Sequence, residues 1–276
     1  MSGSVAVHGT AARRRLFRLT DYQELLRSLL RRELRAKYKG SVLGILWSYF
    51  NPLLLMGVYT LVFSVLWRAV DIPHYPLFVL NGLAVWVFFQ ASLMGGTRSL
   101  IENAPLITKV WFPRELAPLA TVLAQGVTAA VMLGVLIPID LVIEPGSLPT
   151  FLLAVPVFMA FVLLTIGIAW ILAVANVFFR DVEHVVAAIL LPWFFLTPIF
   201  YALEQLPGAA GHEYLIKLIR FGNPVTPYVE TIRAVLLQGA LPGAASLVYV
   251  FVVGPAVFLL GLWVFQLYDD EIAVEL

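Results

Sequence analysis

Six long stretches of this 276-residue chain contain no Asp, Glu, Lys or Arg. A helix rises about 1.5 Å per residue, so roughly 20 apolar residues cross the ~30 Å hydrocarbon core of a membrane. Each stretch is long enough to hold one crossing. We therefore predict an all-α, polytopic membrane protein with six transmembrane helices, placed in residues 40–67, 75–97, 116–139, 145–179, 185–203 and 234–268.

Residues 20–38 predict an amphipathic helix just before the first crossing. Leu and Tyr side chains recur there at spacings of three and four, with arginines between them. A basic amphipathic helix typically lies in the membrane interface, although docking on a protein partner is the alternative. Guanidinium groups match phosphate oxygens, so four side chains are candidates for binding a lipid pyrophosphate or, as the plainer alternative, lipid head groups: Arg27, Arg31, Arg32 and Arg35.

Two connecting segments predict structure of their own. Residues 98–115 form an inner loop with a short helical stretch, a break at Pro105, a second helical stretch and a stop at Pro113. Residues 204–233 form the longest outer loop, which Gly222, Asn223 and Pro224 divide into two amphipathic halves. Neither half is long enough to span, so we predict two short re-entrant helices that dip back from the outer surface before the last crossing.

The charges are few and unevenly placed. Hydrophobic residues make up 61% of the chain and charged residues 13%, whereas a soluble domain carries about 25% charged residues. Of the 18 Lys and Arg, 14 fall on the predicted inner side and 4 on the outer side, and basic segments stay in the cytoplasm. We expect both termini in the cytoplasm, with an N-terminal part (1–39), a six-helix domain (40–268) and a short tail (269–276).

Several kinds of chemistry are disfavoured. The chain has no cysteine, and its four histidines are scattered without ligand spacing, so we expect no catalytic and no metal site. The predicted crossings carry no ionisable Asp, Glu, Lys or Arg, which argues against ion-coupled transport. No Gly is followed by Lys, so the chain has no P-loop. If it is an active transporter, the energy must come from another polypeptide.

Three segments carry a family signature. The first reads RAKYKGSVLGILW from Arg35 and continues to Asn51, Pro52 and Leu53. The second holds Asn103, LITK at 106–109 and FPRE at 112–115, and the third reads FRDV at 179–182, followed by PIFY at 198–201. Their order and spacing resemble the permease subunit of polysaccharide ABC exporters (ABC-2 type transporters), which move O-antigen, galactan or teichoic acid chains. Lys37 stands where that family has Arg.

The resemblance implies a partnership and a substrate. It implies a homodimer with two copies of a separate nucleotide-binding ABC ATPase, which would bind the ATP and Mg, so that this chain holds no cofactor and is not itself an enzyme. It implies a lipid-linked cell-envelope polysaccharide as the substrate, a location in the bacterial cytoplasmic (inner) membrane, and no nucleic acid partner. The resemblance also implies a coupling helix in the first inner loop and gate helices before the last crossing.

The candidate residues fall into two further groups, each with a plainer alternative. The inner loops supply candidates for contact with the ATPase, which are otherwise solvated loop residues or helix anchors: Glu102, Asn103, Lys109, Arg114, Glu115, Arg180 and Asp181. Aromatic side chains of the first and fifth crossings are candidates for a sugar path, because ring faces stack on sugar rings; packing and the interfacial aromatic belt are the alternative. The path candidates are Phe50, Tyr59, Phe194, Phe195 and Tyr201.

Other functions stay open at the level of sequence. An ABC permease for a drug or a small lipid has the same architecture. A membrane-embedded glycan enzyme needs carboxylates or histidines clustered at one membrane face, and the sequence has no such cluster. A scaffold that only recruits an ATPase would not transport anything.

Overall fold

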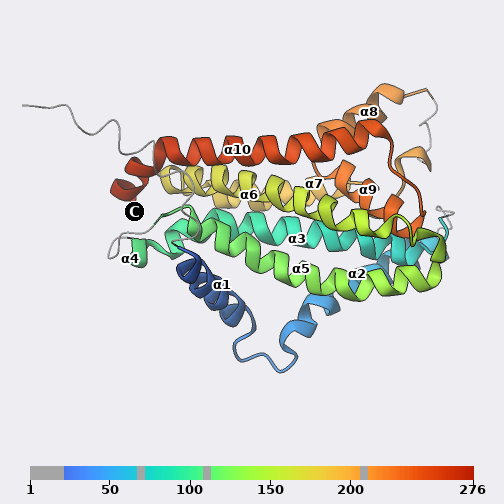
Figure 1. Ribbon diagram of the computed structural model, residues 1–276, viewed down its shortest axis with the longest axis horizontal. Helices are drawn as coiled ribbons and strands as arrows, with labels where there is room; N and C mark the ends of the chain where they lie inside the picture. Colours follow the sequence, from blue (N-terminus) through green and yellow to red (C-terminus); the bar gives the residue numbers. More distant parts are fainter. Residues whose placement is uncertain (1–21, 67–71, 108–112, 206–210) are drawn as a thin grey trace, which may run out of the picture.

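The computed structural model describes residues 22–66, 72–107, 113–205 and 211–276, and every regular element within them is helical. Figure 1 shows the long helices running side by side along one axis. The helices are α1 (Gln23–Tyr38), α2 (Trp47–Tyr59, continued by a π-helical segment Thr60–Leu66), α3 (Tyr75–Glu102), α4 (Ala104–Ile107), α5 (Leu116–Ile143), α6 (Ala154–Phe178), α7 (Val182–Leu196), α8 (Glu213–Gly222), α9 (Thr226–Leu237) and α10 (Ala244–Glu275).

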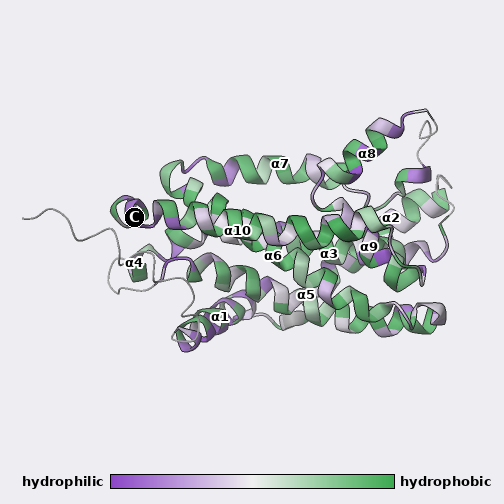
Figure 2. Cartoon of the chain, turned by 45° about the horizontal axis from the view of Figure 1, so that its top comes forward, coloured by the Kyte–Doolittle hydropathy of each residue, from purple (hydrophilic) through white to green (hydrophobic). Residues whose placement is uncertain are grey.

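Five of the described helices are long and apolar enough to cross a membrane: Trp47–Leu66, Tyr75–Glu102, Leu116–Ile143, Phe151–Phe178 and Ala244–Ile272. The polytopic, all-helical architecture predicted from the sequence is confirmed. The fifth predicted crossing is shorter than expected, because α7 has only 15 residues. It spans about 22 Å at 1.5 Å per residue. Figure 2 shows α7 running from one end of the bundle toward the end where α8 lies.

Proline explains why α7 is short. The charge-free stretch continues to residue 203, but the helix ends at Leu196, and Thr197 is extended (φ −91°, ψ 131°). A proline disfavours the helical conformation in the residue before it, and here Pro198 follows Thr197. The chain then passes through an irregular segment to the short 3-10 turn Leu203–Gln205.

The core of the bundle is α3 and α6. Of their most apolar stretches, 72% and 67% of residues are buried, against 6% for α2 and 17% for α10. α10 nevertheless packs very closely on α6, because glycines leave no side chain between the two backbones. A Cβ at Gly167 would overlap the carbonyl of Val257, and a Cβ at Gly261 would overlap the backbone of Gly167. Small residues allow this close approach in membrane proteins.

Several helices extend beyond the charge-free stretches. α3 continues through Arg98 to Glu102, and α10 continues through the expected tail to Glu275. Pro105 lies inside α4 rather than breaking the inner loop. The prediction that the crossings contain no ionisable residue is wrong, because α5 includes Asp140. Asp140 is fully buried and accepts a hydrogen bond from Asn81 Nδ2 at 3.1 Å, so a partner on α3 makes its burial possible.

The N-terminal helix and the two short outer helices are also present. α1 begins at Gln23 and packs on α5, with Leu29 as its buried residue. α8 and α9 flank the predicted break at residues 222–224, and they differ in environment: α8 has no buried residue, whereas most of α9 is buried. Figure 1 places α1 and α4 toward the end that carries the C-terminus, and α8 and α9 toward the opposite end. We call these the inner end and the outer end.

Candidate functional site

The start of the inner loop is bound to the N-terminal helix. Asn103 follows α3, is 4% exposed, and donates from Nδ2 to the carbonyl of Ser99 at 2.7 Å. Its Oδ1 accepts a hydrogen bond from Arg32 of α1. The sequence predicts that Arg32 binds lipid and that Asn103 contacts the ATPase. In the structure the two side chains hydrogen-bond to each other and link α1 to the end of α3.

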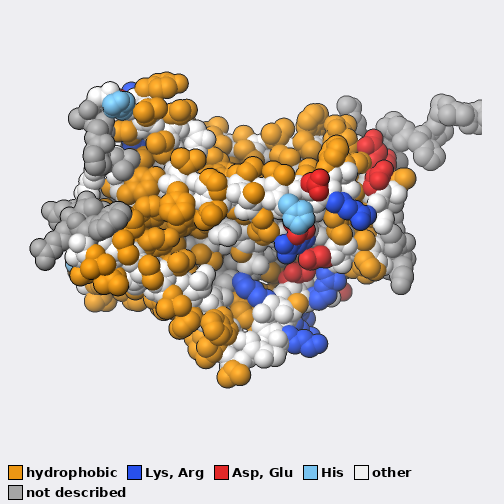
Figure 3. All heavy atoms as spheres, turned by 180° about the vertical axis from the view of Figure 1, so that it is seen from behind, with side chains coloured by type: hydrophobic (Ala, Val, Ile, Leu, Met, Phe, Trp, Pro, Cys, Tyr) orange, Lys and Arg blue, Asp and Glu red, His pale blue; other side chains and the backbone are white. Residues whose placement is uncertain are grey.

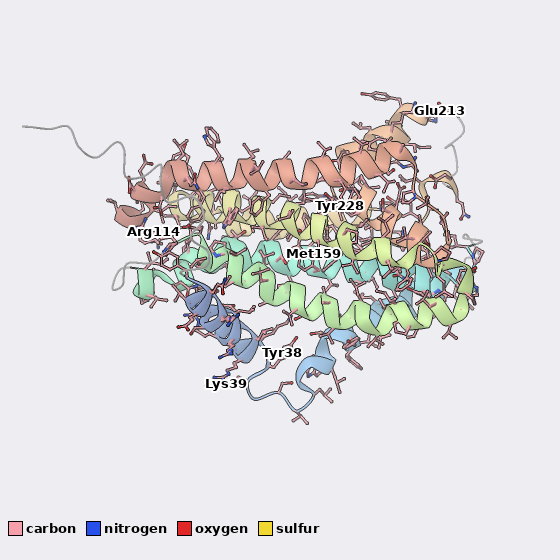
Figure 4. The ribbon with its side chains drawn as sticks, viewed as in Figure 1. Tyr38, Lys39, Arg114, Met159, Glu213 and Tyr228 are labelled. Atoms are coloured by element: carbon pink, nitrogen blue, oxygen red, sulfur yellow. The ribbon has the colours of Figure 1, made fainter. Side chains whose placement is uncertain are left out.

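The end of the same loop is bound to the C-terminal helix. Arg114 Nη1 donates to the backbone carbonyl of Asp269 at 2.5 Å and to its carboxylate Oδ1 at 2.7 Å. Figure 4 shows Arg114 at the end of the bundle where α10 finishes. The next residue, Glu115, accepts a hydrogen bond at its carbonyl from Trp170 Nε1 at 3.0 Å, which links the loop to α6 as well.

Opposing influences act on the pKa of the Glu115 carboxyl group. Burial raises its pKa above the ordinary value of 4.5, and the negative charge of Asp269 raises it further. A hydrogen bond to its own backbone and the positive charge of Arg114 oppose this rise. Glu115 is thus sensitive to whether the contact between Arg114 and Asp269 is intact.

The other inner-end candidates are placed differently. Glu102 is exposed at the end of α3, and Lys109 lies outside the described residues. Arg180 and Asp181 are exposed in the turn between α6 and α7, next to an ion pair of Arg98 with Glu183 at 2.7 Å. Figure 3 shows charged side chains gathered toward the inner end, on a face that is otherwise mostly hydrophobic. These exposed residues could contact a partner directly, whereas Asn103 and Arg114 act within the chain.

The arginines of α1 are exposed, and a hollow runs along this helix. Arg27, Arg31 and Arg35 lie on its exposed side, and the hollow has a volume of about 1110 Å³. It is bordered by charged and apolar residues of α1 that include Arg31, Arg32, Arg35 and Lys39. A head group with phosphate oxygens suits such a lining.

A second groove, of about 620 Å³, lies between the end of α1, the start of α2 and the faces of α3 and α5. Lys37 Nζ donates within it to Gln125 Oε1 at 2.7 Å and to Thr128 Oγ1 at 3.2 Å. The hydroxyl of Tyr38 hydrogen-bonds to Ser48 at 2.9 Å, and Figure 4 shows Tyr38 at the end of α1 nearest α2. The sequence gives no sign of this mostly apolar groove, because the residues that line it are far apart along the chain.

The outer end holds a cluster of aromatic rings from α2, α7 and the segment after α7. Tyr59 stacks on Phe200 with centroids 5.3 Å apart, and Phe63 stacks on Phe200 at 5.2 Å. Phe194 contacts Tyr59 at 6.1 Å and Phe200 at 5.9 Å, and it meets Trp86 of α3 at 5.5 Å. Phe195 and Tyr201 also contact Phe200, at 5.8 Å and 5.2 Å. The structure therefore brings together four of the predicted path residues and adds Phe63 and Phe200.

The remaining path candidates are more exposed. Phe195 is 53% exposed and Tyr201 is half-buried, with the Tyr201 hydroxyl donating to the carbonyl of Phe195 at 3.1 Å. Phe50 is 46% exposed and packs edge-on against Trp47, two turns or more before Tyr59 on the same helix. Phe194, by contrast, is only 8% exposed. Phe50, Phe195 and Tyr201 therefore present ring surface outward, whereas the buried Phe194 packs behind Phe195 with ring centroids 5.4 Å apart.

At the outer end α8 is bound to α9 by ion pairs. Arg220 Nε donates to Glu230 Oε2 at 2.8 Å, and Nη2 of the same guanidinium contacts Glu204 in the 3-10 turn. Arg233 follows Glu230 by about one turn of α9 and is buried in the bundle. Arg233 is the last residue of the segment 204–233, which the sequence predicts as an outer loop, and only the amphipathic pattern of its second half indicated that part of this helix is buried.

The chain is similar to known permeases along most of its length. Residues 24–237 match the ABC-2 type transporter family. An O-antigen export system permease protein, RfbA, from Myxococcus xanthus is 35% identical over 83% of this chain and 86% of its own length. RfbA from Klebsiella pneumoniae is 33% identical over 79% of this chain and 82% of its own length. The polysialic acid transport protein KpsM from Escherichia coli is 23% identical over 88% of this chain and 93% of its own length.

The family match covers all the elements described above except α10. It includes the interface helix, the inner loop, the aromatic cluster and both short outer helices. The resemblance inferred from the three sequence segments is confirmed: the chain belongs to the ABC-2 type transporter family.

Proposed function

We propose that this chain is the permease subunit of an ATP-driven exporter that moves a lipid-linked cell-envelope polysaccharide across the bacterial cytoplasmic membrane. The observation that carries the proposal is the similarity to O-antigen export permeases over about four fifths of the chain. The substrate is a glycan of the O-antigen type on a lipid carrier. Both termini lie in the cytoplasm, as the concentration of Lys and Arg before the first crossing indicates.

The energy comes from a separate ABC ATPase that binds ATP and Mg, since this sequence contains no P-loop. The working complex contains two copies of each subunit. The contact surface for the ATPase is the inner end, where the exposed residues Glu102, Arg180 and Asp181 lie close to the loop that begins at Asn103. Because Arg32 and Arg114 connect this loop to α1 and α10, a force on the loop reaches both helices at once.

The aromatic residues provide a path for the polymer. A polymer of repeating sugars must slide, so its contacts have to be weak and repeated, and ring faces provide contacts of this kind. Phe50, Tyr59, Phe195 and Tyr201 present such faces, with Phe194 behind them. The lipid carrier enters beside α1, where the arginines and Lys37 match a phosphate-bearing head group.

The test is export in cells and in the purified complex. Deleting the gene is expected to remove the surface polysaccharide and to leave lipid-linked polymer on the cytoplasmic side. The chain purified alone is expected to hydrolyse no ATP. Co-purification with its ABC ATPase is expected to give ATP hydrolysis and a complex with two copies of each subunit. Export of a drug or a small lipid, with surface polysaccharide unchanged in the deletion strain, would overturn the proposal in favour of a different substrate class.

A further inference from the structure

Arg233 is a buried cation that hydrogen-bonds to neutral groups. Its side chain is 3% exposed, on the inward face of α9. Nε donates to the carbonyl of Phe78 at 3.0 Å, and the two terminal nitrogens donate to the carbonyls of Pro198 and Ile199. Glu230, one turn earlier, pairs directly with Arg220, and its charge acts on Arg233 only through space. Burying a charge is costly unless it is hydrogen-bonded, so the three carbonyls are the direct partners that make the burial of Arg233 possible.

The neighbouring helix has a space that fits this guanidinium. A Cβ at Gly82 of α3 would overlap Arg233 Nη2 and lie 3.2 Å from the carbonyl oxygen of Ile199. The ring of Phe78, one turn away on the same helix, lies 3.6 Å from the guanidinium carbon. A cation over an aromatic face is stabilised when water is excluded. Gly82 and Phe78 thus form a socket on α3 for a side chain that comes from α9.

The carbonyls that Arg233 binds belong to the irregular segment after α7. Pro198 prevents the chain from continuing as helix, so the carbonyls of residues 198–200 find no partners within a helix and need donors from elsewhere. Arg233 supplies donors for residues 198 and 199, and the hydroxyl of Tyr75 donates to the carbonyl of Phe200 at 2.7 Å. Three consecutive carbonyls, at residues 198–200, are therefore held by side chains of α9 and α3.

The third residue of this segment is the centre of the aromatic cluster. Phe200 stacks on both Tyr59 and Phe63, and it also contacts Phe194. Its ring can hold these contacts only if its backbone is fixed. We infer that Arg233 is a positioning residue, which transmits the position of α9 to Phe200 so that the outer helix pair and the aromatic cluster move as one unit. This inference rests on the proposed function, since it assigns the cluster to the polymer path.

The contacts connect the exposed helix α8, through α9, to the segment of residues 198–200. α8 lies exposed at the outer end and is bound to α9 through Arg220 and Glu230. A displacement of α8 is passed to α9 by this ion pair and from α9 to residues 198–200 by Arg233. The polymer path would then open or close together with the outer helices, rather than independently of them.

The test uses the complex of this chain with its ATPase in lipid nanodiscs. Hydrogen exchange is measured in a peptide that covers residues 197–202. In the wild type this peptide is expected to exchange slowly, because Ile199 and Phe200 are buried and their segment is held. Arg233→Lys keeps the charge but cannot bridge three carbonyls, so exchange is expected to rise roughly tenfold. Lys217→Met, which removes an exposed charge of α8, is the control and is expected to change nothing.

A transport measurement separates positioning from simple loss of structure. Arg233→Lys is expected to slow polymer export several-fold while ATP hydrolysis and complex yield stay near the wild-type level. Tyr75→Phe removes a different contact to the same segment. It is expected to raise exchange of residues 197–202 in the same direction and, in the double variant with Arg233→Lys, by more than the two single effects combined.

Three results would overturn the inference. The first is fast exchange of residues 197–202 in the wild type, which can be read even if every Arg233 variant fails to fold. The second is export by Arg233→Lys that matches the Lys217→Met control. The third is strictly additive behaviour of Tyr75→Phe and Arg233→Lys. An absence of polysaccharide export by the wild-type complex would instead refute the proposed function, so the two failures are distinguishable.

Discussion

Replacing Arg114 tests whether the inner loop and the C-terminal helix form one mechanical unit. Arg114→Ala removes the hydrogen bond to the carboxylate of Asp269 and the one to its backbone carbonyl. The side chains are 16% and 40% exposed, so water screens part of the interaction. A charged hydrogen bond is worth about 1.5–3 kcal/mol and an exposed ion pair about 0–1 kcal/mol, so we expect about 2 kcal/mol for the pair of contacts.

The loss is expected at the inner end of α10. A weakening of about 2 kcal/mol corresponds to a roughly 30-fold more frequent local opening, since about 1.4 kcal/mol is a factor of ten. Hydrogen exchange in residues 266–275 should rise by this order, while exchange in the middle of α10 stays unchanged. Arg180→Ala, which removes an exposed positive charge at the same end, is the control and should leave this peptide as it is in the wild type.

A second variant, Asp269→Ala, separates the two hydrogen bonds of Arg114. In Asp269→Ala the backbone carbonyl remains, so Arg114 keeps one of its two hydrogen bonds. The increase in exchange should therefore be clearly smaller than in Arg114→Ala. Equal effects of the two substitutions would show that the backbone contact contributes nothing. If neither substitution changes exchange of the α10 end, the contact does not hold the helix, and the linkage between loop and helix is refuted.

Three further predictions concern other parts of the molecule. Burial raises the pKa of Glu115, so its contribution to stability is complete below pH 4.5 and is lost as the pH rises through the raised pKa. The thermal midpoint should therefore rise upon acidification, and Glu115→Gln should flatten this rise. Gly261→Ala pushes α10 away from α6 and should lower stability by about 2 kcal/mol, whereas Gly134→Ala, which meets nothing within 4 Å, should not. Phe50→Ala and Phe195→Ala should slow polysaccharide export while leaving the thermal midpoint of the complex nearly unchanged, because both rings are largely exposed.

The sequence predicts the helical architecture and the order of its elements well, because the bilayer imposes a simple rule. A stretch without charges that is long enough to cross forms a helix, since the backbone must satisfy its own hydrogen bonds in hydrocarbon. The break between α8 and α9 is equally local, as Gly222, Asn223 and Pro224 stand together in the chain. Helix ends are harder to predict, because charged residues such as those from Arg98 to Glu102 continue a helix readily once it has left the membrane.

The contacts between helices could not be predicted, because each joins residues that are far apart in the chain. Asp140 lies 59 residues from Asn81, and Arg233 lies 155 residues from Phe78. A single arginine in an amphipathic helix is typical of a solvent-exposed face, and nothing nearby in the sequence indicates a socket on α3. The same holds for Arg32 and Asn103, which the sequence placed in two separate functional groups.

Polar side chains fix the relative positions of the helices at particular places in this apolar chain. In the middle of the bundle, α6 and α10 meet through glycines, and close packing alone sets their distance. Toward the ends, polar groups join different helices. Arg114 joins the inner loop to α10, and Asn176 of α6 donates to the carbonyl of Thr97 in α3 at 3.0 Å. Arg233 joins α9 to the segment that follows α7. Hydrogen bonds fix both direction and distance, whereas apolar surfaces can slide past one another. Under the proposed function, force enters at the inner end and the path opens at the outer end, so directional contacts are needed at those two places, and these hydrogen bonds supply them.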